Sequence, residues 1–249
     1  MQPFVTEDSI VRKIWGQTDT VLFIFAGASA EFALNKAVDW LYFTGKLPAD
    51  PLGRLLSTVA YAKKIVFTSL DEANRSIDML RQIHSTVEAN RGAGIPDWAY
   101  RHELFMLIHY SIASFELLNR KLTLEEKQEV FDVFYRVGKR MGLQQLPTDY
   151  TTWLQARDAH LEQDLQESKY TRHLFRQYRA HLGLLRYLAL VEAQKLLVPP
   201  RVRLLLKFSR FSVLTLIMPI YKFFRQMKLD KAIRHLLLPA GYEKQLAQN

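Results

Sequence analysis

Four polar residues stand where the surrounding sequence predicts burial, and their types could bind or activate a small ligand. Arg54 and Thr58 are four residues apart, and His84 and His109 each interrupt a mainly apolar segment. Burying an arginine, a threonine or a histidine costs free energy unless each group finds a partner. We therefore expect these four residues to mark a binding site rather than only to support the fold.

Arg54 and Thr58 share one face of a helix predicted over residues 52–67, because a spacing of four places them one turn apart. A guanidinium keeps its charge, so an inward-facing Arg54 needs an anion such as a carboxylate, a propionate or a bound peroxide. The alternative is a structural ion pair with Asp39 or Asp50. The local sequence leaves both interpretations open.

His84 lies within the apolar stripe of a helix predicted over residues 71–90. Members of this stripe recur at steps of three and four, which is the helical period. They are Ala73, Ile77, Leu80, His84 and Val87. A neutral imidazole at such a position either hydrogen-bonds to a carbonyl or carboxylate, as core histidines do, or ligates a metal such as iron.

His109 lies in a segment, residues 104–118, that is apolar on most faces, so we expect its side chain to be buried. Glu116 follows seven residues later on the same helix face and is its candidate carboxylate partner. His102, in contrast, sits between Arg101 and Glu103, and this charged run predicts a solvent-facing histidine.

Other chemistries lack their sequence signals. The chain has no cysteine, which excludes disulfides, thiolate metal sites, cysteine-ligated haem and a cysteine nucleophile. No Gly-x-Ser-x-Gly, phosphate-binding glycine loop or His-Glu-x-x-His motif occurs. The histidine and carboxylates between Asp158 and Asp164 are predicted to form a solvated helix face rather than a metal site.

Length and composition are those of one large domain, or of two. The chain has 249 residues, of which 49% are hydrophobic, so it can bury a core and is not disordered. The N-terminal residues lack the basic start and apolar run of a secretory signal. No uncharged apolar stretch reaches the ~18 residues that a membrane-spanning helix requires. We expect a cytoplasmic protein.

The net charge of +9 is concentrated near the C-terminus. Residues 201–234 contain nine Lys or Arg and one acid, Asp230, among Leu, Phe and Ile. Basic and apolar residues together favour peripheral contact with an anionic membrane. The alternative is a packed helix pair whose cations keep it soluble. A nucleic-acid partner is not expected, because the cations are interleaved with aliphatic residues rather than with aromatic side chains that stack on bases.

The pattern predicts an all-α protein of about ten helices. Ser69–Glu72 and Thr123–Glu126 have capping-box spacing, and alternation typical of strands is missing. We expect a single domain over residues 1–249, with residues 8–198 forming a core around a buried cofactor pocket and residues 199–249 packed on it. The predicted helices cover residues 8–15, 18–44, 52–67, 71–90, 98–120, 124–141, 150–178, 182–196 and two or more segments after residue 200.

Several segments, taken in order, resemble the family of the rubber oxygenase (latex clearing protein) and the fungal oxygenase MpaB. The resemblance covers roughly residues 8–165. It rests on the order of the segments rather than on any one of them. They are residues 50–58, 66–73, 84–87, His109, residues 122–126 and 142–147, with a weaker echo at 236–239.

This resemblance implies a mostly helical domain with one haem b whose iron is held by a single histidine. By position, His84 would be the axial ligand, Arg54 and Thr58 would line the distal side, and His109 would support the cofactor. Ser57 departs from the rubber oxygenase, which has a lysine there, and this argues against cleavage of rubber itself. The only acid in the apolar segment before Arg54 is Glu31.

The resulting prediction is a haem-dependent oxygenase that uses dioxygen on a hydrophobic substrate, isoprenoid or lipid-like. An apolar, water-excluding pocket would admit such a substrate. The alternative is a non-enzymatic helical protein that binds haem or lipid at a membrane surface.

Overall fold

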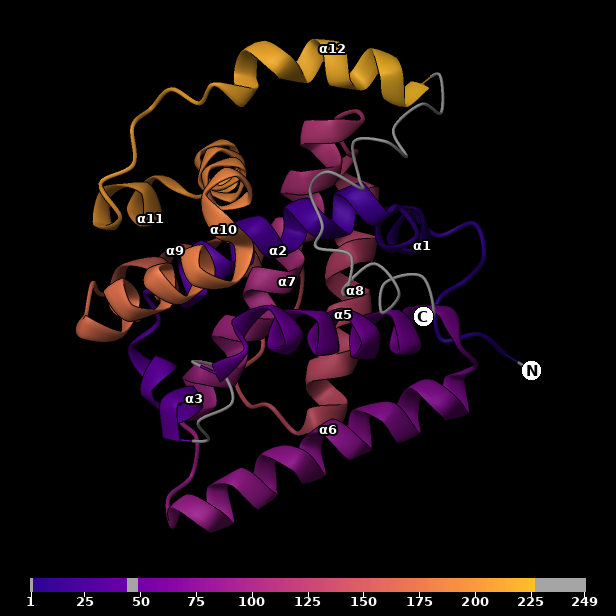
Figure 1. Cartoon of the computed structure of the whole chain (residues 1–249). Helices are drawn as coiled ribbons and strands as arrows, with labels where there is room; N and C mark the ends of the chain where they lie inside the picture. The colour runs from indigo at the N-terminus through magenta and orange to yellow at the C-terminus, as the bar shows by residue number, and fades with distance from the viewer. Residues whose placement is uncertain (1, 44–48, 227–249) are drawn as a thin grey trace.

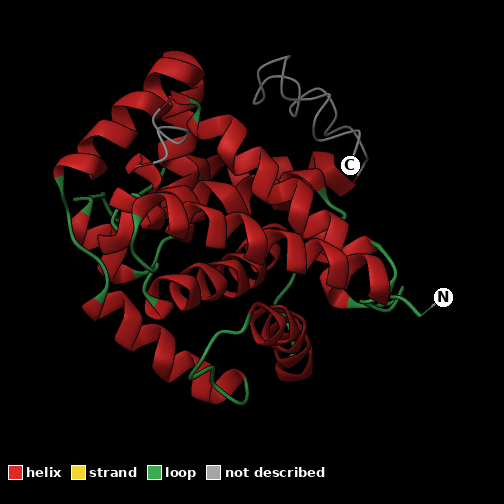
Figure 2. Ribbon diagram, turned by 90° about the horizontal axis from the view of Figure 1, so that it is seen from below, coloured by secondary structure: helices red, strands yellow, loops and turns green. Residues whose placement is uncertain are grey.

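A computed structural model describes residues 2–43 and 49–226 (Figure 1). The weak family echo at residues 236–239 and the last predicted basic residues lie outside the described part, as does the side chain of Arg54. The described residues fold into helices joined by short loops, as Figure 2 shows. The all-α prediction is confirmed: the described residues form no strand, and their only bridges are the isolated pairs Pro3–Ser69 and Asn35–Leu165.

The helices follow one another along nearly the whole chain. Their bounds are α1 (Ile10–Trp15), α2 (Thr18–Phe32), a 3-10 turn (Lys36–Val38), α3 (Asp39–Phe43), α5 (Pro51–Phe67), α6 (Leu70–Arg91), α7 (Asp97–Leu118), α8 (Leu124–Met141), α9 (Tyr150–Gln163), α10 (Lys169–Leu197), α11 (Pro200–Leu205) and α12 (Leu214–Gln226).

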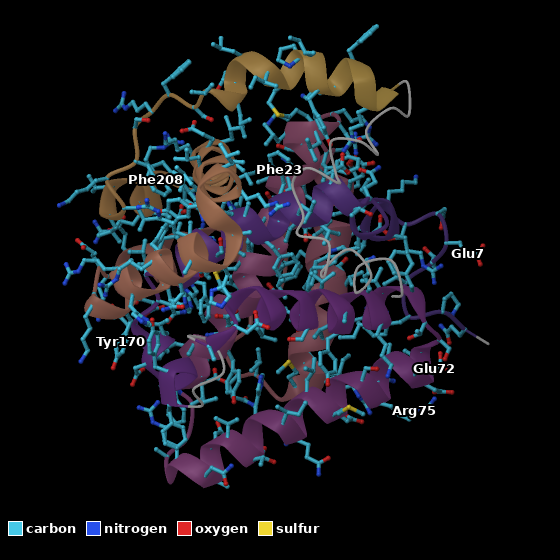
Figure 3. The ribbon with its side chains drawn as sticks, in the orientation of Figure 1. Glu7, Phe23, Glu72, Arg75, Tyr170 and Phe208 are labelled. Atoms are coloured by element: carbon cyan, nitrogen blue, oxygen red, sulfur yellow. The ribbon has the colours of Figure 1, made fainter. Side chains whose placement is uncertain are left out.

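Helix α2 lies at the centre and packs most extensively on α7 (Figure 1). Most of its residues are buried and none is exposed, so it has no polar face to turn toward water. Gly27 allows the close approach: a Cβ there would lie 2.3 Å from Cδ1 of Tyr110 on α7. Side chains from α2, α7, α8 and α1 form the main core, while Glu72 and Arg75 on α6 point away from it (Figure 3).

Two predicted helices are each divided. Residues 18–44 were predicted as one helix, but α2 ends at Phe32 and Asn35 caps the following 3-10 turn by accepting from the Ala37 N–H at 2.7 Å. Residues 150–178 are also split, because α9 ends at Gln163 and Ser168 caps a new helix, α10. Short polar side chains offer the backbone an alternative to continuing a helix, and this ends both segments.

Local capping signals elsewhere act as predicted. The Thr123–Glu126 capping box begins α8, and Gly142 ends it in the left-handed conformation with φ of 84°. The break predicted between residues 178 and 182 takes the form of a kink in α10 at Gly183, whose φ is 72°.

The last described helix, α12, is fastened to α2 by polar contacts. Arg225 forms an ion pair with the buried Asp19, and the Tyr221 hydroxyl donates to the same carboxylate at 2.9 Å. The side chain of Met218, which belongs to α12, is buried. None of the helices in the described part is both long and apolar enough to cross a membrane.

Candidate functional site

A buried carboxylate lies at the junction of α2, α7 and α9. Both Glu31 oxygens accept hydrogen bonds from Arg157, each at 2.5 Å, and both residues are almost completely buried. The Tyr110 hydroxyl donates to Glu31 Oε2 at 2.8 Å, and His102 Nε2 lies 2.9 Å from Oε1. This Glu31 network therefore joins three helices through one carboxylate.

The network compensates the charges that it buries. Burial alone would raise the pKa of Glu31, but Arg157 and His102 outweigh it and hold that pKa well below its usual range. Burial would likewise lower the pKa of Arg157, and the Glu31 carboxylate reverses this. Burial and the adjacent Glu31 raise the pKa of Tyr110, so its hydroxyl keeps the proton that it donates. Glu31 is thus held as a carboxylate that accepts hydrogen bonds from its neighbours.

The prediction that His102 faces solvent was wrong, because its side chain is fully buried. Arg101 and Glu103 on either side are partly exposed, and Arg101 pairs with Asp97. In a helix, adjacent residues point about 100° apart, so a charged run can still turn one member inward. Tertiary packing against α2 and α9 decides the outcome, not the neighbours in sequence.

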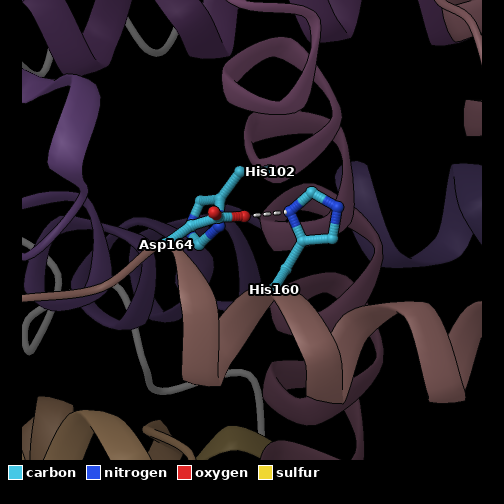
Figure 4. Close-up of side chains that lie close together, drawn as sticks. All are labelled: His102, His160 and Asp164. Atoms are coloured by element: carbon cyan, nitrogen blue, oxygen red, sulfur yellow. Dashed lines mark ion pairs between the residues drawn. The ribbon is translucent and has the colours of Figure 1, made fainter.

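His160 and Asp164, at the end of α9, lie beside His102 (Figure 4). His160 Nδ1 is 2.6 Å from Asp164 Oδ2, and the His102 and His160 ring centroids are 6.1 Å apart. One ligand atom from each of the three residues lies within 4.8 Å of the others, so the group could hold a metal ion. The prediction of a solvated face is correct for Asp158 and Glu162, which are exposed, but not for His160 and Asp164, whose side chains are only slightly exposed.

Positive neighbours and burial control the ionisation of these α9 groups. Burial, reinforced by His102, Arg101 and Arg157, lowers the pKa of His160 to about 4, so its imidazole is neutral at pH 7. Burial raises the pKa of Asp164, and Coulombic contributions from His102, Lys36 and Arg101 oppose this shift.

His109 faces the same side of α7 as His102, since seven residues are close to two helical turns. Its ring meets the Tyr110 ring edge-on, with centroids 4.8 Å apart, and it hydrogen-bonds to the Leu197 backbone. Burial, with a further contribution from Arg157, lowers its pKa to about 4. Glu116, the carboxylate predicted to pair with His109, instead forms ion pairs with Lys121 and Lys127.

His84 lies on a different face of the molecule, between α6 and α7. Its ring packs on Tyr100 with centroids 5.1 Å apart and planes inclined by 34°. Tyr100 is fixed in turn, because its hydroxyl donates to Glu88 at 3.1 Å. Tyr100 and His109 are nine residues apart, which places them on opposite sides of α7. His84 and His109 therefore lie on opposite sides of α7.

Thr58 and Arg54 lie on α5, which forms a hairpin with α6 through the turn at Thr68 and Ser69. The Tyr61 hydroxyl contacts Met79 Sδ at 3.8 Å, which gives the register of this antiparallel pair. Thr58 lies one turn before Tyr61 and is therefore level with residue 82 of α6. Arg54 lies a further turn away and is level with residue 86, so the two α5 positions fall on either side of His84 along α6.

Asp39 and Asp50, the two acids considered as partners of Arg54, each make contacts within the described part of the chain. Asp39 accepts from Arg91 at 2.7 Å, and Asp50 accepts from the Gly53 N–H at 2.8 Å as the cap of α5. Arg91 also stacks over Trp40, with 3.9 Å from its guanidinium carbon to the ring centroid.

Comparison with known families gives one match. The model of the family "ER-bound oxygenase mpaB/B'/Rubber oxygenase, catalytic domain" matches residues 12–235, most of the chain. The chain belongs to this family. No curated protein and no solved structure matches it significantly. Membership supports an oxygenase, with a small molecule and oxygen as reactants.

For this mpaB/rubber oxygenase family member, sequence reasoning singled out Glu31 but missed Arg157, Tyr110 and His102 as its partners. One signal was available: a lone acid in the otherwise apolar residues 21–34 needs a buried cation somewhere in the chain. The sequence around Arg157, with Asp158 beside it, gives no local sign that this arginine is the partner.

Proposed function

We propose that this chain is a haem b-dependent oxygenase in which His84 is the axial ligand of the iron. The observation that carries this proposal is an incompletely buried stripe on α6. Ala73 and Ile77, near the start of the helix, are fully buried, whereas Leu80, His84 and Val87 are partly exposed. The second half of this apolar helix face is only partly covered by other side chains, so it is suited to pack against a flat hydrophobic ligand.

The residues around His84 fit such a cofactor. Thr58 on α5 and Tyr100 and Leu107 on α7 are also only partly buried, so three helices contribute incompletely packed faces. Helix α6 diverges from α5 as it runs away from their turn, and His84 lies in the diverging half (Figure 1). An imidazole is the side chain that most commonly holds haem iron in oxygen-binding proteins.

In this proposal the haem supplies an iron that activates dioxygen, and the protein supplies position and polarity. His84 would hold the iron, and packing against Tyr100 would keep the imidazole from rotating. The Thr58 hydroxyl and the Arg54 guanidinium would donate hydrogen bonds to negative charge that develops beside the cofactor. Apolar side chains such as Leu80 and Leu107 would exclude water and admit a hydrophobic, isoprenoid or lipid-like substrate.

The proposal includes reversible contact with an anionic membrane through α12. Five exposed apolar residues recur at helical spacing along this segment: Val213, Leu216, Ile217, Ile220 and Phe223. The exposed Leu184, Leu185 and Leu188 lie on α10, which α12 contacts. Cations in the same region, including Lys207, Arg210 and Lys222, suit anionic headgroups. We call these five residues, Val213 and four residues of α12, the apolar row.

We further propose that residues 1–249 form one domain, with residues 8–198 as its core and residues 199–249 as a basic, apolar part that packs on it. The Arg225–Asp19 pair and the buried Met218 support this packing as far as α12.

The visible absorption spectrum of the purified chain tests the central proposal. A Soret band is expected for the wild type, and His84→Ala should remain helical by circular dichroism but lose the band. His181→Ala is the matched control, because His181 lies on α10 and hydrogen-bonds to backbone carbonyls of Gln177 and Ala49. A full haem complement in His84→Ala, together with its loss in His109→Ala, would assign the ligand to His109 instead.

The enzymatic and non-enzymatic alternatives separate in a second measurement. A haem-loaded chain that consumes oxygen and converts a terpenoid alkene is an oxygenase. A loaded chain with a Soret band and no turnover of terpenoid or lipid alkenes would be a haem-binding protein.

A further inference from the structure

The cluster of His102, His160 and Asp164 is not used by the proposed haem site and has its own unexplained feature. His102 is fully buried, and its Nε2 is directed to Glu31. Both ring nitrogens are buried, and neither makes a hydrogen bond of standard geometry with the described residues, although Nε2 lies 2.9 Å from Glu31 Oε1. A buried polar atom without a partner typically destabilises a protein by about 1–3 kcal/mol, so such atoms call for an explanation.

The Glu31 network would orient His102 as a metal ligand. Histidines that bind metals usually donate their second N–H to a carboxylate, which fixes the tautomer and the ring orientation. Glu31 supplies that carboxylate at 2.9 Å, and it is itself held by Arg157 and Tyr110. The contact of Nε2 with Glu31 leaves Nδ1 as the second ring nitrogen, which is buried and has no partner among the described residues.

We propose that His102, His160 and Asp164 bind a divalent transition-metal ion at a site separate from the haem. Two imidazoles and one carboxylate are a donor set that suits zinc or iron(II), leaving further coordination positions open. The three ligand atoms lie within 4.8 Å of one another, and the side chains of His160 and Asp164 are 12% and 15% exposed, so an ion can enter from that side.

The geometry needs only a small adjustment to accept an ion. Ligand atoms around a tetrahedral ion lie roughly 3.3 Å apart at zinc–nitrogen and zinc–oxygen bond lengths. On metal binding, the 2.6 Å distance between His160 Nδ1 and Asp164 Oδ2 would increase. Any distance between ligand atoms of the three residues that is longer than roughly 3.3 Å, within the limit of 4.8 Å, would decrease. His160 lies in the last turn of α9, and Asp164 is the C-cap of that helix.

The donor types, rather than the nearby cations, make the site selective for transition metals. Arg157 is neutralised by Glu31 and Arg101 by Asp97, while Lys36 donates to the Gln163 carbonyl at the same end of α9. A single carboxylate in such surroundings attracts magnesium or calcium poorly, since these ions require several oxygen ligands. Imidazole donors favour zinc and its neighbours in the periodic table.

Zinc titration of the full-length chain, after dialysis against a chelator, tests the site by calorimetry and by elemental analysis. Zinc is used because haem iron does not interfere with its measurement. The wild type should bind one zinc ion per chain and should not bind magnesium comparably. His160→Ala and Asp164→Asn should each weaken zinc binding by at least ~10-fold, the lower limit seen when even a supporting residue is lost.

Glu162→Gln is the matched control, because Glu162 is an exposed carboxylate on the same helix that pairs with Arg201. It should bind zinc like the wild type. The proposal is overturned if the folded wild type binds no stoichiometric zinc, or if both ligand variants bind as tightly as the control. Should His160→Ala fail to fold, Asp164→Asn decides, since it preserves side-chain volume. The Soret band reports haem independently, so failure here and failure of the haem proposal are distinguishable.

Discussion

Glu31 on α2 and Arg157 on α9 form a doubly hydrogen-bonded ion pair inside the core, although 126 positions separate them in the sequence. Glu31 is fully buried, and Arg157 is only 2% exposed. The pair ties the first long helix to α9 and fixes the carboxylate on which Tyr110 and His102 converge. Several measurable properties depend on this arrangement.

Glu31→Gln should lower the free energy of unfolding by about 3–5 kcal/mol, because it leaves the Arg157 charge buried without its counter-ion. Urea unfolding monitored by circular dichroism measures the change. Glu167→Gln is the matched control: Glu167 pairs with Arg172 at 3.1 Å on the surface, and its loss should change stability by less than about 1 kcal/mol. Equal, small effects in both variants would mean that the buried pair does not stabilise the fold.

Gly27→Ala should destabilise the protein by about 1–3 kcal/mol through overpacking. The new methyl group would lie 2.3 Å from the Tyr110 ring, which cannot move freely because its hydroxyl is bonded to Glu31. Gly94→Ala controls for the intrinsic effect of alanine, since no atom lies within 4 Å of the position that its methyl group would take. Thermal melting of the two variants should therefore differ clearly, and a stabilised Gly27→Ala would contradict the close approach of α2 and α7.

Stability should fall between about pH 6.5 and pH 4 in a manner that depends on His109. Its pKa is about 4 in the folded protein because of burial and Arg157, with Glu31 and the Leu197 carbonyl opposing, against about 6.5 in an unfolded chain. Between these values the unfolded state binds a proton that the folded state does not, so unfolding becomes easier as the pH falls.

The measurement is the free energy of unfolding at about pH 7 and about pH 5. The decrease should be smaller in His109→Gln than in the wild type, whatever the absolute stability of the variant. An identical decrease in both proteins would show that His109 titrates normally in the folded state.

Arg54→Ala should retain most of the haem and lower turnover by about a hundredfold, the scale expected when one preorganised hydrogen-bond donor is lost. Thr58→Val, which preserves side-chain shape, should act in the same direction. Arg75→Ala, on the exposed face of α6, is the control. An insoluble Arg54→Ala, with Arg75→Ala soluble, would assign Arg54 to a structural ion pair.

The wild type should cosediment with anionic liposomes at low salt and be released at high salt, because each cation near such a surface contributes about 1 kcal/mol that ions screen. Leu216→Glu with Ile220→Glu should abolish binding by placing charges in the apolar row. Leu154→Glu, at an exposed leucine on α9, should not. Absence of binding at low salt, or binding that resists high salt, would refute reversible electrostatic contact.

Local chemistry in the sequence determined most of the secondary structure. The segment 124–141 was predicted with the bounds that α8 has, because a capping box and a left-handed glycine act within one turn of the chain. The helical period also placed Ala73 and Ile77 in the core correctly. The family resemblance came from the order of short segments, and the match over residues 12–235 confirmed it.

Only the tertiary structure decided which polar groups meet. His102 stands among charged neighbours and is nevertheless buried, and Arg157 carries no local sign that Glu31 is its partner. Such pairs depend on how α2, α7 and α9 cross, and crossing angles arise from side-chain packing along whole helices. A local pattern reports which face of a helix is apolar. It does not report which distant helix covers that face, and so it could not reveal the Glu31 network or the histidines that lie beside it.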